Sequence, residues 1–339
     1  MIVDFRSDTL TKPTEGMLKA MMKADTGDDV FGEDPTVNKL EQMAADLFGM
    51  EASLYCPTGT QSNQIAIKVH TVPGDEVICE ETSHVYQYEG GGIAFNSGAQ
   101  TKLLKGTRGQ VTAVHVLESI NPDDPHKPVS KLVSLENTCN RGGGSCYQFN
   151  AIEDIRKVCD DNNLMLHLDG ARLFNALVAT GQSAKQYGKT FHSISVCLNK
   201  GLGCPIGSIL LGKKSFIYKA RRVRKVFGGG MRQAGYMAAC GIYALENNID
   251  RLAEDHLLAK KIATVLEGKQ FVDSILPVET NIIIFSVKPY LKANDLVEKL
   301  KKEGILVIAM SPTQIRFVTH LDIQPEMVEY TLKKLKEIN

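Results

Sequence analysis

Three segments of this sequence place a side chain that can do chemistry where an apolar run ends. A run rich in β-branched residues stops at Lys200 and is followed by Gly-Leu-Gly, and an earlier run, LMLHL, stops at Asp169. Further upstream, a strand-like LYC precedes a turn with Gly59 and Thr60 and then a helical pattern. The N-terminus of such a helix binds phosphate groups. A lysine amine, a carboxylate and a phosphate site together are what pyridoxal phosphate (PLP) needs for its Schiff base, its pyridine nitrogen and its phosphate.

Each of these features has an ordinary structural explanation when it stands alone. Lysines near strand ends are usually solvated, an aspartate before glycine is usually a turn residue or a helix N-cap, and many strand-to-helix turns contain Gly-Thr. Their order is harder to explain by chance, because each lies where an apolar strand ends, and ligands of open α/β sheets bind at the carboxyl ends of strands. The sequence therefore predicts a PLP site at Gly59, Thr60, Asp169 and Lys200.

Three further residues are candidates for the same pocket. Arg172 follows Asp169 by three residues, and its alternative role is a structural salt bridge. His84 follows a strand and is suited to stack on a cofactor ring, although a structural role is the usual explanation for one histidine. Arg316 lies in the strand-like IRFV, where a buried arginine needs a partner such as a substrate carboxylate.

Other segments are less specific. His126 lies in the loop NPDDPHKPVS, where solvent exposure is the alternative to a functional role. A triple glycine at 228–230 precedes Arg232 and allows close approach to a ligand or a neighbouring subunit. GSILLGK at 207–213 spells most of a P-loop, but Lys214 stands where a magnesium-binding Ser or Thr is needed. Its interior is also an apolar strand, so we reject a P-loop.

Strands alternate with helical patterns along most of the chain, which predicts an α/β fold with a mostly parallel sheet and helices on both faces. We expect a large PLP-binding domain over 1–250, including an irregular N-terminal segment, and a small C-terminal domain over 251–339. The basic segment 218–233 is expected to lead into a long helical region. Its charged side chains are expected to be exposed in a monomer: Arg221, Arg222, Arg224 and Lys225. Strands are expected within the segments 54–70, 75–81, 131–137, 164–172, 193–208 and 207–215.

Composition excludes several classes of function. Lys plus Arg and Asp plus Glu both number 39, so there is no electrostatic case for a nucleic-acid or membrane partner. No apolar run reaches the length of a membrane span, and the first residues do not have a signal-peptide pattern. Eight scattered cysteines fit a reducing compartment better than disulfides or a zinc site. We therefore expect a cytoplasmic protein without a metal.

Longer motifs resemble those of a known family. DFRSDTLTKPT, GDDVFGEDPTVNKLE, PTGTQSN, LHLDGARLFNA, CLNKGLGCPIGS and GGGMRQAG are ordered as in the low-specificity L-threonine aldolases, which group with the β-eliminating lyases among the fold-type-I (aspartate aminotransferase-like) PLP enzymes. The resemblance implies a seven-stranded-type sheet, a smaller C-terminal α+β domain and a homotetramer with shared active sites. It also implies aldol cleavage of L-threonine or L-allo-threonine to glycine and an aldehyde. A β-eliminating lyase or a serine hydroxymethyltransferase-like enzyme is the alternative.

The resemblance also assigns roles to single residues around the cofactor. It implies that Lys200 forms the Schiff base and that Asp169 holds the pyridine nitrogen. His84 is implied to stack on the ring, and Gly59 and Thr60 are implied to bind the phosphate.

The same resemblance assigns the substrate contacts. Ser7, Arg172 and Arg316 are implied to hold the substrate carboxylate, with Arg172 also close to the cofactor. A neighbouring subunit is implied to supply Arg232 to the phosphate and His126 to the substrate hydroxyl.

Two points stay open. The group that deprotonates the substrate hydroxyl is His84, His126 or a water. The sequence departs from the family pattern at Cys139, where histidine is frequent, and at Asn199, where serine is frequent.

Overall fold

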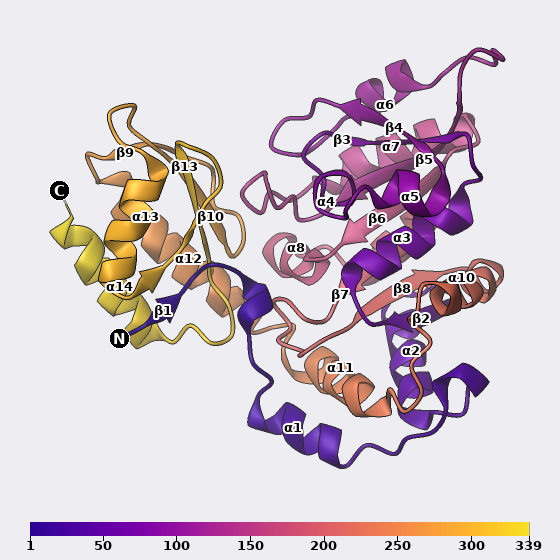
Figure 1. Cartoon of the computed structure of the whole chain (residues 1–339), viewed down its shortest axis with the longest axis horizontal. Coiled ribbons are helices and arrows are strands. Elements are labelled where there is room, and N and C mark those ends of the chain that lie inside the picture. The colour runs from indigo at the N-terminus through magenta and orange to yellow at the C-terminus, as the bar shows by residue number, and fades with distance from the viewer. Residues whose placement is uncertain (339) are drawn as a thin grey trace.

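The computed structural model describes residues 1–338. A larger part contains a seven-stranded sheet and a smaller part a four-stranded sheet, and the two parts lie side by side (Figure 1). The seven strands are β2 (Ala52–Cys56), β3 (Asp75–Glu80), β4 (Gln100–Leu104), β5 (Val129–Glu136), β6 (Met165–Gly170), β7 (Ser193–Cys197) and β8 (Ser208–Gly212). Their order across the sheet is β2-β8-β7-β6-β5-β3-β4.

This sheet is mostly parallel, as the sequence predicts. Only β8 runs antiparallel to its neighbours β2 and β7, while β7, β6, β5, β3 and β4 pair in parallel. Asp169 is in register with Glu136 of β5 and Ser195 of β7. The carboxyl ends of these strands therefore meet at one edge of the sheet.

Helices cover both faces of the sheet. The helices of the larger part are α1 (Glu15–Met22), α2 (Pro35–Phe48), α3 (Gly59–His70), α4 (His84–Gln87), α5 (Gly92–Ser97), α6 (Ala113–Ser119), α7 (Phe149–Asp161), α8 (Leu173–Thr180), α9 (Ala184–Thr190), α10 (Lys214–Val226) and α11 (Gly235–Asn247). Leu54 of β2 packs with α3 and α10, whereas the adjacent Tyr55 packs in the core on the opposite face with α2. This alternation is expected of a strand buried on both faces.

The basic segment after β8 is itself a helix, α10. Phe216, Ile217, Ala220 and Arg224 form its buried face. Arg224 donates from Nη2 to Asp29 Oδ2 at 2.7 Å and from Nη1 to a backbone carbonyl at 2.6 Å. The prediction that Arg224 is exposed is wrong, because it follows Ala220 by four residues and the helical period places both on the same face.

The smaller part combines helices with the strand order β12-β13-β10-β9. Its elements are α12 (Leu252–Glu267), β9 (Val272–Ile275), β10 (Ile282–Val287), α13 (Ala293–Lys302), β11 (Ile305–Leu306), β12 (Ile308–Ala309), β13 (Gln314–Val318) and α14 (Pro325–Glu337). The first strand of the chain, β1 (Val3–Asp4), lies against this part (Figure 1) and pairs in parallel with β11. Val3 and Phe5 are buried in its core. The N-terminal residues therefore pack with the C-terminal ones.

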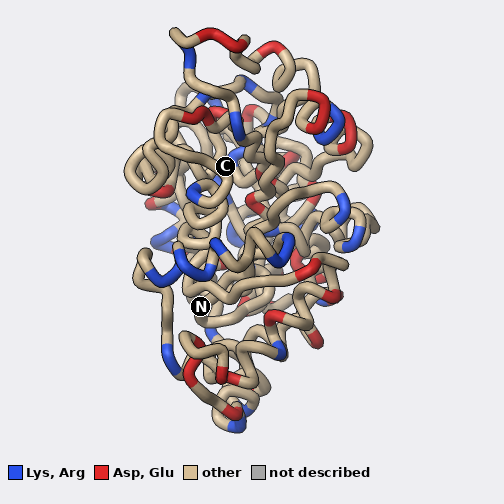
Figure 2. The backbone as a smooth tube through the Cα atoms, turned by 90° about the vertical axis from the view of Figure 1, so that its right-hand side faces the viewer, with Lys and Arg blue, Asp and Glu red and all other residues tan. Residues whose placement is uncertain are grey.

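Charge and apolar surface agree with the composition. Lys and Arg as well as Asp and Glu occur in the upper, middle and lower parts of the view in Figure 2. No helix among residues 1–338 combines the length and the apolar character needed to cross a membrane. All eight cysteines are buried and free.

Candidate active site

The turn between β2 and α3 presents unsatisfied backbone donors. Thr58 caps the helix, since its hydroxyl accepts from the Gln61 N–H at 3.1 Å. Gly59 and Thr60 are the first two residues of α3, where backbone N–H groups have no intrahelical acceptor. A Cβ at Gly59 would lie 2.5 Å from Cys197 Sγ, so only glycine fits there. This turn therefore has the free donors and the close packing with which helix N-termini can bind an anion.

Asp169 is buried on β6, and its carboxylate is held by two donors. Oδ2 accepts from Asn63 Nδ2 at 2.9 Å, and Oδ1 accepts from the Ala171 N–H at 3.1 Å. The same Asn63 nitrogen also donates to Glu89 Oε1 at 2.9 Å. One amide on α3 thus fixes the positions of two buried carboxylates.

A chain of hydrogen bonds links His70, Ser193, His167 and Asn63 to Asp169. Burial lowers the pKa of His167 to about 4 and that of His70 to about 3, so both imidazoles are neutral. His167 Nε2 donates to Asn63 Oδ1 (3.1 Å), because the Asn63 nitrogen already donates to Asp169. His167 Nδ1 then accepts from the Ser193 hydroxyl (2.8 Å), which accepts from His70 Nε2 (2.8 Å). Every donor in this chain points toward the carboxylate of Asp169.

His84 begins α4 beside these acidic groups. Its Nδ1 lies 3.0 Å from Glu89 Oε1, and its backbone N–H donates to Glu136 Oε2 at 2.6 Å. Burial lowers the pKa of His84, but the bond to Glu89 and the charges of Asp169 and Glu89 outweigh burial and raise it overall. Ligand atoms of His84, Glu89 and Asp169 lie within 4.8 Å of one another, as in a cation site. The Asn63 amide nitrogen, however, donates to both carboxylates of this set.

Lys200 follows β7 at the place where two cavities meet. It lines a cavity of about 150 Å³ together with Gly59, Thr60 and Asp169, and a second cavity of about 430 Å³. His84 also lines both cavities. The Lys200 amine forms no hydrogen bond or ion pair within the described chain. An uncommitted amine therefore stands between the turn at Gly59 and Thr60 and a larger chamber.

Three arginines, Arg141, Arg172 and Arg316, line the larger cavity, and among residues 1–338 only Arg172 pairs with a carboxylate. Arg172 donates from Nε and Nη2 to the two carboxylate oxygens of Asp8, both at 2.7 Å. Arg316 donates to Asn140 Oδ1 (2.9 Å) and to the Arg6 carbonyl (3.0 Å), but its buried Nε has no partner among residues 1–338. Burial and repulsion by Arg172 lower the pKa of Arg316 to about 10. A buried guanidinium without a carboxylate partner is a site for an anion.

Comparison with known proteins places this geometry in a family. Residues 4–289 match the family described as beta-eliminating lyase. The chain belongs to this family. It is 42% identical over 328 residues to the low specificity L-threonine aldolase of Escherichia coli K12, covering 96% of both chains. It is 40% identical over 346 residues to the probable low-specificity L-threonine aldolase 2 of Arabidopsis thaliana, covering 99% of this chain and 97% of the relative.

Solved structures show the same fold. The threonine aldolase of Leishmania major superposes with a TM-score of 0.86 at 20% identity, covering 99% of each chain. A putative L-allo-threonine aldolase of Listeria monocytogenes gives a TM-score of 0.80 at 22% identity, covering 97% of this chain and 96% of the other. The prediction of an aspartate aminotransferase-like α/β fold is confirmed.

Most of the residues singled out from the sequence line the two cavities of this family member, and two do not. His126 lies in an exposed loop with its side chain 91% exposed and 2.9 Å from Asp124. Arg232 is half exposed and pairs with Asp28 at 2.6 Å. The residues that line the cavities are Ser7, Gly59, Thr60, His84, Asp169, Arg172, Lys200 and Arg316.

Sequence reasoning missed the residues that hold these groups in place. His167 had a detectable signal, because it precedes Asp169 by two residues and so shares its face of β6. Asn63 follows Thr60 by three residues and shares its side of α3. Asp8 stands next to Ser7 in a motif of which only Ser7 was interpreted. Glu89 gives no signal, since nothing in its sequence context indicates burial.

Proposed function

We propose that this protein is a PLP-dependent aldehyde-lyase that cleaves L-threonine, L-allo-threonine and similar β-hydroxy-α-amino acids to glycine and an aldehyde. The observation that carries the proposal is the uncommitted amine of Lys200 at the junction of the two cavities. The names of the E. coli and Arabidopsis relatives support the choice of reaction.

The smaller cavity fits the cofactor from end to end. The N–H groups of Gly59 and Thr60 would bind its phosphate, Lys200 its aldehyde carbon and Asp169 its ring nitrogen. His84 lines the same cavity and would lie against the ring. When bound, PLP supplies a ring that accepts the electron pair released at the substrate α-carbon.

The larger cavity fits the amino acid. Arg316, which has no carboxylate partner among residues 1–338, would bind the substrate carboxylate together with Arg172 and the Ser7 hydroxyl. This contact would fix the orientation of the bond between Cα and Cβ. His84 holds Glu89 at Nδ1, which leaves Nε2 to take the proton of the β-hydroxyl. A water or His126 of a second copy are the other candidates for this base.

We also propose that the chain works as an oligomer, with a tetramer as the form that the family resemblance favours. His126 and Arg232 lie outside both cavities. His126 is exposed and would reach the site of a neighbouring copy directly, whereas the half-exposed Arg232 would first exchange Asp28 for the neighbour's phosphate. Eight unpaired cysteines support a reducing compartment, which we propose is the cytosol, and a place in amino-acid metabolism.

The purified protein, offered threonine, allo-threonine and serine, should form glycine and an aldehyde in equal amounts. Keto acid and ammonia instead would assign it to β-elimination and refute the proposal. The protein should absorb visible light, and borohydride should fix the cofactor on Lys200. Lys200→Ala should lose the visible band, whereas Lys225→Ala on the surface should keep it. A label on Lys213 or Lys225 would refute the role of Lys200.

A further inference from the structure

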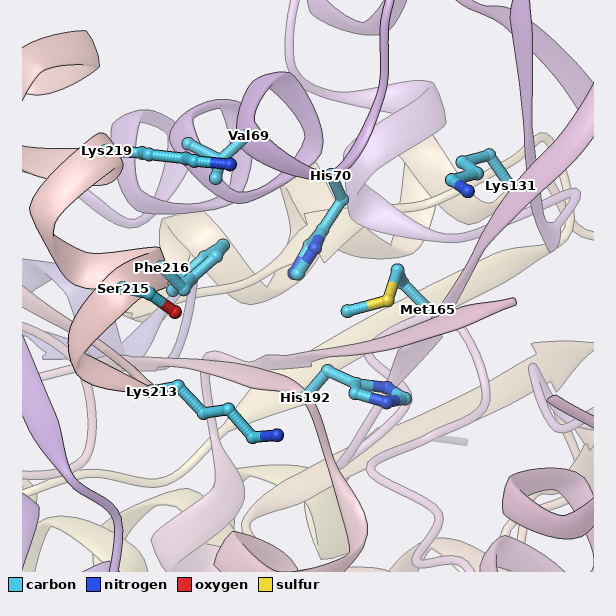
Figure 3. A pocket seen from close by; sticks show the side chains of 9 residues that line it. All are labelled: Val69, His70, Lys131, Met165, His192, Lys213, Ser215, Phe216 and Lys219. Carbon is cyan, nitrogen blue, oxygen red and sulfur yellow. The ribbon is translucent and has the colours of Figure 1, made fainter. Parts of the chain in front are cut away.

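A separate cavity opens at the edge of the sheet opposite Asp169 and Lys200. It lies where β6 begins and β8 ends, beside the end of α3 and the start of α10 (Figure 3). Its volume is about 270 Å³. None of its lining residues belongs to the cavities described above. The proposed reaction therefore makes no use of this space.

Three lysines from three elements surround this cavity. Lys131 comes from β5, Lys213 from the residue before α10, and Lys219 from the second turn of α10. Their side chains lie on three sides of the space that His70, Phe216 and Met165 border (Figure 3). None of the three pairs with a carboxylate within residues 1–338, and no described lining residue is acidic. An anion in this space would therefore face unpaired positive charge on three sides.

Uncharged donors complete the lining. α10 spans 13 residues, and its N-cap Lys213 makes no side-chain capping bond. Its first N–H, that of Lys214, donates to Glu51 Oε2 at 2.9 Å, so the neutral donors of the cavity are side chains. Ser215, the second residue of this helix, also lines the cavity. His192 Nδ1 accepts from the Leu166 N–H at 2.9 Å, which leaves the proton on Nε2. The cavity is thus lined by hydrogen-bond donors of both kinds, charged and neutral.

One wall of the cavity is apolar and aromatic. The ring of His70 stacks on Phe216, with 4.6 Å between centroids and 18° between planes. Val69 and Met165 continue this wall (Figure 3). The volume leaves room for a small organic group beside one tetrahedral anion, and the stacked rings offer it a flat surface.

We propose that this cavity binds a phosphate group, either free or as the monoester of a small apolar compound, at a site distinct from the cofactor. Phosphate suits it better than a monocarboxylate, because a dianion with several acceptor oxygens matches three lysines and the neutral donors of Ser215 and His192. The inference does not depend on the proposed cleavage reaction.

The test is calorimetric titration of the PLP-loaded protein with inorganic phosphate at constant ionic strength. PLP fills its own phosphate site, so we expect saturable binding of one further phosphate per chain. Lys213→Met combined with Lys219→Met should weaken this binding at least about tenfold. The control is Lys214→Met, which removes an exposed lysine from the same helix start but not from the cavity lining. It should change affinity by less than about twofold.

Three results would overturn the proposal. They are the absence of saturable binding, equal weakening by Lys214→Met, and loss of phosphate binding when PLP is added to the apoprotein. The double variant should keep its melting temperature and its threonine cleavage in phosphate-free buffer. These two measurements exclude loss of the fold as the cause of weaker phosphate binding. Phenyl phosphate distinguishes the two ligands: tighter binding than inorganic phosphate assigns an ester, and weaker binding assigns the free ion.

Discussion

Replacing Arg316 by methionine tests the substrate site most directly. The change keeps most of the side-chain length and removes the guanidinium. In the structure Arg316 Nη1 donates to Asn140 Oδ1 and Nη2 donates to the Arg6 carbonyl. The buried Nε has no partner among residues 1–338. Each Nη carries a second N–H, and these two are therefore the donors for a carboxylate in a bidentate contact.

The expected loss follows from those two donors. Hydrogen bonds to charged groups contribute about 1.5–3 kcal/mol each, and the two share one carboxylate, so we expect a total of about 2–4 kcal/mol. This corresponds to a fall in kcat/KM of roughly 30- to 1,000-fold. Most of the fall should be in KM, because the carboxylate is held before and during the reaction. The variant also loses its repulsion with Arg172, which offsets part of the stability lost at Asn140 and Arg6.

The assay is steady-state aldehyde release over a range of threonine concentrations, with PLP content read from the visible band. Arg316→Lys is the matched variant, since it keeps the charge without the planar fork, and it should fall between wild type and Arg316→Met. Unchanged KM in Arg316→Met, or loss of PLP from a folded variant, would show that Arg316 does not hold the substrate carboxylate.

Three other outcomes are expected. Burial raises the pKa of Asp8 and Arg172 lowers it, with a net value of about 2. The Asp8 carboxylate therefore stabilises the folded state fully above the usual pKa of 3.8, and this stabilisation is lost as the pH falls through about 2. Asp8→Asn should therefore lower the free energy of unfolding at pH 7 by on the order of 2 kcal/mol, with the difference vanishing near pH 2 in urea melts, and equal stability at pH 7 would contradict this. Asn63→Ala should weaken PLP binding about tenfold, because it removes the donor that Asp169 and Glu89 share. Asn63→Asp should weaken PLP binding more, because it adds a third carboxylate beside these two. Absorbance titrations that give the reverse order would contradict the proposed role of Asn63. Dilution should release PLP and lower specific activity together, with added PLP restoring both, if Arg232 serves a neighbouring copy; sedimentation of an active, PLP-loaded monomer would rule that out.

The parts of the site that could be predicted from the sequence are those encoded locally. Lys200 and Asp169 each follow an apolar strand, and Gly59 and Thr60 lie between a strand and a helix, so a few neighbouring residues reveal their positions. The alternation of strands and helices predicts the parallel sheet in the same way.

The rest depends on contacts between distant segments. Asp8 and Arg172 are 164 residues apart in sequence, and the pair forms only because the N-terminal segment lies over the larger cavity. The burial of Arg224 depends on Asp29, which a short helix of a distant segment presents to it. Local charge patterns suggest exposure for such residues, and only tertiary packing decides otherwise.

The pairing of Val3 with Ile305 has a consequence for the order in which the protein is made. The first strand leaves the ribosome early, but its partner strand is synthesised near the end of the chain. Ser7 and Asp8 follow that strand directly and line or support the substrate chamber. A growing chain can thus complete its seven-stranded sheet and the Lys200 wall while the other side of the chamber is still missing. We expect the protein to gain its substrate site last, and all at once, when its two ends meet.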